Sequence, residues 1–255
     1  MRQVAKKVLK PLRMYRIAVR LFYRIFPMWM PDRRKTISFF SQFIKQGDLC
    51  FDVGANRGDL TKAFLALGAS VVCIEPQEVC LTHLYKLFGN NKNVFIVGKA
   101  VADREGEAVF SICEDRNTIS TMSNTFKVAS RYAKDYQWTK TQKVAATTLD
   151  ALIQLYGAPD FCKIDVEGAE ELVLKGLTRP VHLVSFEYTR ELHDDAKKCI
   201  NYLLSLGQAI FNFSIAASME LLLPTWVTSD ELFERLESSQ DELLVGDIYA
   251  RFLPS

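Results

Sequence analysis

A regular alternation of apolar strand-like runs and helical runs, which starts at Gly47, constrains the fold of this 255-residue chain more than any other feature. The run DLCFDVG predicts a strand over 49–53, and RGDLTKAFLALG predicts a helix that ends at Gly68. SVVCIEP predicts a strand over 70–75, followed by a helix that ends at Gly89. Strands that alternate with helices form right-handed βαβ units around a parallel sheet. Strands that are apolar throughout suit a sheet covered on both faces.

The alternation pauses and then resumes toward the end of the sequence. The run GEAVFSIC predicts an edge strand or hairpin arm, and the polar interval 114–142 follows it. An interval of that length without regular structure is typically functional or mobile. Its segment 120–123 could close over a substrate or belong to a disordered connector. Further strands are predicted over 143–146, 160–165, 181–187, 208–213 and 244–252, and helices over 148–156, 169–176, 193–206 and 229–239. We therefore expect about seven strands in the main sheet.

The first 35 residues differ in charge from the rest of the chain. They contain 11 Lys and Arg residues and one acid, Asp32, which gives +10, so the remainder carries about −8 of the net charge of +2. Apolar side chains spaced three and four apart predict an amphipathic helix over 12–26. Such a helix could pack on the domain, lie on an anionic membrane surface or touch nucleic-acid phosphates. With 49% hydrophobic and 24% charged residues, we predict a helical extension over 1–46 and one domain over 47–255.

Cysteine usage and the lack of long apolar runs bear on the compartment. None of the six cysteines forms a C-x-x-C pair, and four lie in apolar runs, so we expect free buried thiols and no metal site. Lys or Arg interrupts residues 1–24 every few positions, so we predict no secretory signal. No run approaches the ~18–20 apolar residues of a membrane span. We expect a cytoplasmic protein and leave open a peripheral contact of residues 1–30 with the inner membrane surface.

The stretch FDVGANRGDL predicts a ligand site at the end of the first strand. Ligands of such sheets bind at the carboxyl ends of the strands. Gly54 and Gly58 permit close approach of a ligand to the backbone, and Asn56 could bridge backbone and ligand. The stretch does not fit the dinucleotide pattern G-x-G-x-x-G. Asp52 would repel a pyrophosphate but attract a cationic amino-acid group. This combination favours S-adenosylmethionine (SAM), whose reaction product is S-adenosylhomocysteine (SAH), over NAD.

The second strand ends at an acid in the position that suits a ribose. Glu75, followed by Pro76, comes roughly 20 residues after the glycine turn, the spacing of an acid that binds ribose hydroxyls. We expect the adenine ring near residues 99–103, where Ala100 and Asp103 are the candidates. Asp103 could equally be an ordinary turn residue.

The stretch KIDVEGAEELVLKGL places several carboxylates where another buried strand ends. Asp165 should point into the same crevice as Asp52, with Glu167 in the turn beside it. Glu170 in the first helical turn could simply complement the helix dipole. Methyl transfer to a hydroxyl needs a proton acceptor, and Asp165, Glu187 and His193 are the candidates. Their structural alternatives are a turn former, a salt-bridge partner and a helix cap.

Together these motifs resemble the FkbM family of SAM-dependent methyltransferases. The resemblance rests on FDVGANRG, CIEPQ, AVADREGEAVFSI, TTLDALI and KIDVEGAEELVLKGL, and covers about residues 47–190. It implies the Rossmann-like class I methyltransferase fold, a seven-stranded sheet with an antiparallel last strand, and methyl transfer to oxygen on sugars or other small molecules. This chain has Gln77 where many members have Asn, and its basic head lies outside the shared region.

The function expected from these features is SAM-dependent O-methylation of a sugar or another small hydroxyl compound. The residues predicted to bind the cofactor are Asp52, Gly54, Ala55, Asn56, Gly58, Glu75, Pro76, Ala100, Asp103 and Asp165, and the predicted catalytic residues are Asp165, Glu187 and His193. Two alternatives stay open. One is a nucleic-acid methyltransferase that uses the basic head, although no NPPY-like motif is present. The other is a non-catalytic SAM-binding protein at a membrane. The sequence does not predict an oligomeric state.

Overall fold

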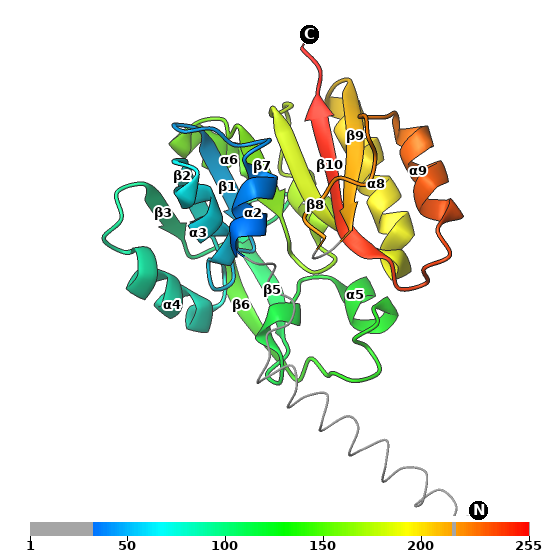
Figure 1. The fold of residues 1–255 in the computed structure, drawn as a ribbon. Coiled ribbons are helices and arrows are strands. Elements are labelled where there is room, and N and C mark those ends of the chain that lie inside the picture. Colours follow the sequence, from blue (N-terminus) through cyan, green and yellow to red (C-terminus); the bar gives the residue numbers. More distant parts are fainter. Residues whose placement is uncertain (1–32, 216–217, 255) are drawn as a thin grey trace, which may run out of the picture.

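The computed structural model describes residues 33–215 and 218–254. Its centre is a seven-stranded sheet in the order β3-β2-β1-β7-β8-β10-β9 (Figure 1). The strands are β1 (Leu49–Val53), β2 (Ser70–Ile74), β3 (Val94–Val97), β7 (Phe161–Ile164), β8 (Leu183–Thr189), β9 (Ala209–Ile215) and β10 (Val245–Phe252). β10 runs antiparallel to both of its neighbours, and the other pairs are parallel. The expectation of a mainly parallel sheet with an antiparallel last strand is therefore confirmed.

Helices cover both faces of this sheet. The helices are α2 (Arg33–Phe40), α3 (Asp59–Ala66), α4 (Glu78–Phe88), α5 (Asn124–Ala129), α6 (Leu149–Tyr156), α7 (Glu170–Leu174), α8 (His193–Leu206) and α9 (Ser229–Ser238), with 3-10 turns η1 (Asn117–Ile119) and η2 (Arg190–Leu192). Buried side chains of α6, α7, α8 and α9 pack on one face, and those of α2 and α3 pack on the other. Strands with no polar side, as the sequence indicates, are buried by these two layers.

Local sequence signals fix several helix ends. Gly68 has φ +87°, and its N–H donates to the Leu65 carbonyl. Helix α3 therefore ends just before this glycine, as the sequence predicts. The hydroxyl of Thr148 accepts the N–H of Ala151 at the start of α6. Thr228 forms a capping box with Glu231 at the start of α9.

The polar interval 114–142 is folded, although its sequence predicts no regular structure. It contains η1 and α5, and it ends in β6 (Lys140–Thr147), which joins β4 (Ala100–Val101) and β5 (Gly106–Ile112) in a second, three-stranded sheet. Phe126 is buried against Tyr132 and Trp138, and the indole N–H of Trp138 donates to the Ile119 carbonyl at 2.8 Å. These aromatic side chains supply the apolar core that a scan for strand or helix periodicity does not detect.

The second sheet and α5 lie beyond one end of the main sheet, on the side to which the parallel strands point (Figure 1). β4 pairs in parallel with β6, and β5 pairs antiparallel with β6. The three strands and the segment that follows β5 therefore roof the carboxyl edge, which is the edge where the predicted ligand residues lie.

The chain just before β1 packs on the main sheet through aromatic side chains. Phe39 and Phe40 of α2, with Phe43 after it, are buried against Phe161 and Tyr249. The helix α2 ends at Phe40, within the helical extension predicted over 1–46. The predicted amphipathic helix over 12–26 and the membrane contact of residues 1–30 lie outside the described residues. The domain boundary after residue 46 stays a prediction.

The cysteines and the helices bear on two further expectations. All six cysteines are free and buried, which confirms the prediction of buried thiols. No helix within residues 33–215 or 218–254 combines the length and the apolar character that a membrane span requires.

Gly54 sets how closely the ends of two central strands approach each other. Its φ is +83°, and a Cβ added to it would lie 1.8 Å from the carbonyl oxygen of Asp165. Its N–H and that of Ala55 both donate to the Ile74 carbonyl, at 2.9 and 3.0 Å. The glycine therefore lets the turn after β1 fit between the ends of β2 and β7.

We expect Gly54→Ala to destabilise the protein by about 3 kcal/mol or more, because strain at positive φ adds to a clash with the main chain. Gly47→Ala is the matched control, since Gly47 has φ +91° but nothing within 4 Å of the added Cβ. Its cost should be about 1 kcal/mol. Urea denaturation of both variants measures the difference, and equal losses would contradict the role given to the close approach.

Candidate active site

A cleft of about 210 Å³ opens at the carboxyl edge of the main sheet. It lies between the ends of β1, β2 and β7 and the roof made by the second sheet and residues 118–122. Its lining residues are Val53, Gly54, Asn56, Ile74, Glu75, Pro76, Gln77, Lys99, Ala100, Val101, Phe110, Thr118, Ser120, Met122, Asp165, Val166 and Glu167. The lining therefore combines apolar side chains with three carboxylates and one lysine.

Glu75 is the best-fixed carboxylate of the cleft. Its Oε2 accepts the N–H of Asn56 at 2.9 Å, and its Oε1 accepts the N–H of Gln77 at 2.8 Å. The side chain is 2% exposed, and burial raises its pKa to about 7 although both N–H groups favour the carboxylate. Each oxygen keeps a second acceptor direction, because a carboxylate has about four lone-pair sites. Glu75 can thus join the two loops and still accept hydrogen bonds from a ligand.

The turn after β1 brings only some of its predicted ligand residues to the cleft. Gly54 and Asn56 line it, and Asn56 has the positive φ of +47°. Ala55 packs with α4, and Gly58 caps α3 where an added Cβ would lie 2.6 Å from Phe88. Ala55 and Gly58 therefore shape the turn and do not line the cleft.

Asp52 faces α3, outside the cleft lining. It is 2% exposed, and its Oδ2 accepts the hydroxyl of Thr61 at 2.5 Å. Burial raises the pKa of Asp52 to about 6, against the opposing effects of Thr61 and Lys163. These contacts anchor the first turn of α3 beneath the glycine turn. Thr61 was not singled out from the sequence, because its spacing from Asp52 has meaning only once a helix folds back over the strand.

Of the residues predicted to lie near the ribose and the adenine ring, some line the cleft and others do not. Pro76 and Ala100 line the cleft, whereas Asp103 is exposed beside Arg104 and does not. The sequence missed Gln77, Phe110 and Met122 as lining residues. Ser120 and Met122 belong to the segment 120–123 that was considered as a closing element. They reach the cleft because β5 and β6 place the segment over it, which no local signal encodes.

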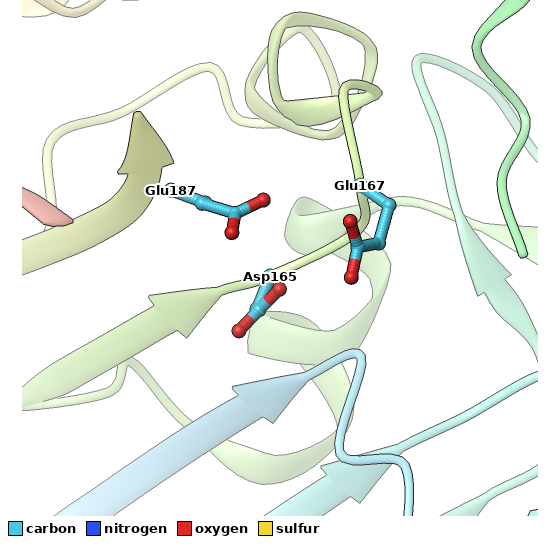
Figure 2. A group of neighbouring side chains, drawn as sticks. All are labelled: Asp165, Glu167 and Glu187. Carbon is cyan, nitrogen blue, oxygen red and sulfur yellow. The ribbon is translucent and has the colours of Figure 1, made fainter. Parts of the chain in front are cut away.

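Three carboxylates meet beside the cleft, at the ends of β7 and β8. Figure 2 shows Asp165, Glu167 and Glu187 pointing toward one another. One oxygen from each lies within 4.8 Å of the other two. Asp165 and Glu187 come from neighbouring strands, and Glu167 comes from the turn after β7, where it has φ +56°. Among the described residues this is the one group of three or more Asp, Glu, His or Cys side chains whose possible metal-ligand atoms lie that close together. The expectation of no metal site stays a prediction.

Burial and the neighbouring carboxylates raise the pKa of two of these groups. Burial raises the pKa of Glu167 well above its usual value, with Asp165 and Glu170 adding to the effect. Burial also raises the pKa of Glu187 well above its usual value, and Glu167 and Asp165 contribute. A proton or a positively charged group of a ligand would relieve this repulsion.

The turn that carries Glu167 is held from two sides. Oε1 of Glu170 accepts the N–H groups of Val166 and Gly168, at 3.2 and 3.1 Å. The hydroxyl of Thr121 in the roof donates to the Glu167 carbonyl at 2.7 Å. Glu170 therefore closes the turn, a role more specific than the helix-dipole effect considered from the sequence.

His193 lies apart from the carboxylates, at the first position of α8. Its Nδ1 is 3.1 Å from the hydroxyl of Tyr188, and its Nε2 is 3.1 Å from Oε1 of Glu237. It does not line the cleft. The structure thus brings Asp165 and Glu187 together and leaves the third predicted proton acceptor with partners of its own.

The comparison with protein families agrees with this geometry. The model of the methyltransferase FkbM domain matches residues 52–209, which is more than half of the chain. The chain belongs to the FkbM methyltransferase family. It is a SAM-dependent methyltransferase with the class I fold, which confirms the family, the enzyme class and the cofactor inferred from the sequence.

Matches to individual proteins cover a shorter part of the chain than the family match or have low sequence identity. An rRNA adenine N-6-methyltransferase of Bacteroides fragilis is 40% identical over 55 residues, which span 22% of this chain and 21% of that relative. A precorrin-6y C5,15-methyltransferase of Geobacter metallireducens is 11% identical with a TM-score of 0.44, covering 87% of both chains. A TehB-like SAM-dependent methyltransferase of Corynebacterium glutamicum is 8% identical with a TM-score of 0.45, covering 94% of this chain and 99% of that one.

We expect the affinity for SAM to rise as the pH increases through about 7, the pKa of Glu75. Below that pH the protonated carboxyl loses acceptor capacity for ligand hydroxyls, and above it both oxygens accept. Between pH 6 and 8 the affinity should increase by up to about tenfold, as isothermal titration calorimetry can measure.

Glu75→Gln should weaken binding and flatten this pH dependence, because the amide neither titrates nor offers two acceptor oxygens. Glu78→Gln is the matched control, since Glu78 is exposed at the start of the adjacent helix. An unchanged pH profile in Glu75→Gln would remove Glu75 from the cofactor site.

Proposed function

We propose that this FkbM-family enzyme transfers the methyl group of SAM to a hydroxyl of a sugar or another small molecule. The observation that carries the proposal is the meeting of Asp165, Glu167 and Glu187 beside the cleft, where Asp165 and Glu167 line it. A hydroxyl acceptor needs to lose a proton during attack, and a carboxylate with a raised pKa is suited to take it. Carboxylates also accept hydrogen bonds from the neighbouring hydroxyls of a polyhydroxyl compound.

In this proposal the cofactor lies along the cleft. Glu75 accepts hydrogen bonds from the ribose hydroxyls, and Gly54 and Asn56 adjoin the amino-acid part. Pro76, Ala100 and the apolar roof side chains pack on the adenine ring. Asp165, which lines the cleft at the end of β7, adjoins the positively charged part. SAM supplies an electrophilic methyl group, so the protein has chiefly to orient, exclude water and remove a proton.

Glu187 is the proton acceptor in this proposal. Its raised pKa and its place on the strand next to that of Asp165, close to the Asp165 carboxylate but outside the cleft lining, support this role. Positioning of two reactants can lower a barrier by roughly 7–11 kcal/mol, whereas general base catalysis adds about 10²–10⁴-fold. Glu167 has a carboxylate oxygen within 4.8 Å of one of Glu187 and adds to the repulsion that raises the pKa of Glu187, and His193 serves the structure of α8.

A nucleic-acid acceptor is the second candidate, because the short match to an rRNA adenine N-6-methyltransferase favours it. The charge at the cleft argues the other way. Its lining includes Glu75, Asp165 and Glu167 but only one basic residue, Lys99. Phosphate backbones bind through Lys and Arg side chains, and the carboxylates that line the cleft would repel them. The basic residues at 1–35 are the part of the chain that could offset this repulsion.

Glu187→Gln should lower kcat by about 10²-fold or more while SAM still binds, because the amide cannot take the proton. His193→Asn should keep activity within about threefold, since His193 lies outside the cleft. Steady-state kinetics with detection of SAH measures both. Assays are repeated with EDTA and with added Mg²⁺. Activity that EDTA abolishes and Mg²⁺ restores would assign the carboxylates to a metal instead, and full activity of Glu187→Gln would remove it from the mechanism.

Methyl-labelled SAM distinguishes the two acceptor classes. We expect label in a sugar or other hydroxyl compound from an acceptor panel, and none in RNA at low or moderate salt. Deletion of residues 1–32 should leave transfer to a small acceptor intact. Label on adenine in RNA that depends on this segment and falls steeply with salt would favour the second candidate. Glu75→Gln serves as the cofactor-dependence control in both assays.

A further inference from the structure

Lys163 is a buried cation that the proposed chemistry does not use. Of the Lys and Arg side chains in the described residues, it is the one that is buried, with 2% exposure. It occupies the penultimate position of β7, a central strand whose other residues are apolar. Burying a charge is costly unless hydrogen-bonded partners compensate for it. Its position therefore calls for a specific explanation.

The ammonium group has three partners. Nζ lies 3.0 Å from Oδ1 of Asp247 and 3.4 Å from Oδ2 of Asp165, and it donates to the Ile164 carbonyl at 3.1 Å. Burial disfavours its charge, but the attraction of Asp165 and Asp247 outweighs burial and raises the pKa of Lys163 well above its usual value. The side chain is thus a fixed cation that donates to one main-chain carbonyl and is paired with two carboxylates.

This contact spans three strands. Lys163 on β7 is opposite Ser185 on β8, and Glu187 on β8 is opposite Asp247 on β10. The lysine side chain therefore crosses β8 to reach the antiparallel strand. Ser185 is small and fully buried, which leaves room for that path. Adjacent strands lie about 4.8 Å apart, so a crossing of two spacings suits the length of a lysine.

Asp165 depends on this lysine for its orientation. The Asp165 side chain is 41% exposed, and Lys163 is the ion-pair partner that the described residues offer it. Two further carboxylates, Glu167 and Glu187, face it and would push it away. Without the ammonium group, the described residues offer the Asp165 carboxylate no other ion pair that would hold it at the cleft.

We propose that Lys163 is a positioning residue that, anchored by Asp247, holds the Asp165 carboxylate toward the positively charged part of SAM. The inference rests on the proposed function, in which Asp165 adjoins that part. It adds that the antiparallel strand β10 takes part in organising the site, although none of its residues lines the cleft. Lys163 acts through Asp165 and not by contact with the cofactor.

The test compares binding of SAM and SAH, because SAM carries a sulfonium charge that SAH lacks. Calorimetry gives the ratio of their affinities, and a general loss of structure would change both alike. Asp165→Asn should lower the preference for SAM by about tenfold. Lys163→Met combined with Asp247→Asn removes one positive and one negative charge, which keeps the local net charge constant. We expect this double variant to lower the preference by at least about fivefold.

Dependence on Asp165 is tested by combining the substitutions. If Lys163 acts through Asp165, adding Lys163→Met and Asp247→Asn to Asp165→Asn should change the preference by less than about twofold. Lys143→Met with Glu107→Gln is the matched control, since these residues form an exposed ion pair at 3.0 Å and do not line the cleft. Its preference should equal that of the unmodified protein.

The outcomes separate the two proposals. An unchanged preference in Asp165→Asn refutes the role of Asp165 and with it that of Lys163. A reduced preference in Asp165→Asn with an unchanged one in the double variant refutes the role of Lys163 alone, as would a further independent loss in the triple variant. Should the double variant fail to fold, Asp247→Asn alone decides. It removes the anchor, so a preference still equal to that of the unmodified protein overturns the inference.

Discussion

The close approach of the ends of β1 and β7 is the constraint on which the site depends. A Cβ on Gly54 would collide with the carbonyl of Asp165, so only glycine permits this contact. The N–H groups of the same turn donate to the end of β2, those of Gly54 and Ala55 to the Ile74 carbonyl and that of Asn56 to Glu75. Three strand ends are thereby drawn to one edge. The cleft for the cofactor is the space that remains beneath the roof of the second sheet.

Repulsion among the carboxylates at this edge raises the pKa of two of them, which is the property that a proton acceptor needs. Asp165, Glu167 and Glu187 lie too close together to be independent, and burial with mutual repulsion raises the pKa of both glutamates. The ammonium group of Lys163 neutralises part of this negative charge through Asp165, and Asp247 anchors the lysine. Asp165, which is paired with Lys163, and Glu187, whose pKa is raised, can therefore take different roles in one reaction. That division is the physical content of the proposed mechanism.

Much of the main sheet follows from local patterns, but the roof does not. The alternation of apolar strands and helices, with glycines such as Gly68 at helix ends, predicted the order of elements and the class of fold. The interval 114–142 has polar composition and no sustained period. Its order comes from contacts such as that of Trp138 with Phe126, and from β6, which extends further than the predicted strand over 143–146. Contacts between residues distant in sequence leave no local signal.

The sequence by itself determined the family, the cofactor and the residues at the strand ends, because parallel strands necessarily bring their carboxyl ends to one edge. Only the tertiary structure decided which partners those side chains meet. Asp52 turns toward Thr61, His193 toward Tyr188, and Asp103 toward solvent, whereas Glu187 joins Asp165. The physical reason is that side-chain direction depends on the partner that a neighbouring element presents. That partner is fixed when the elements pack.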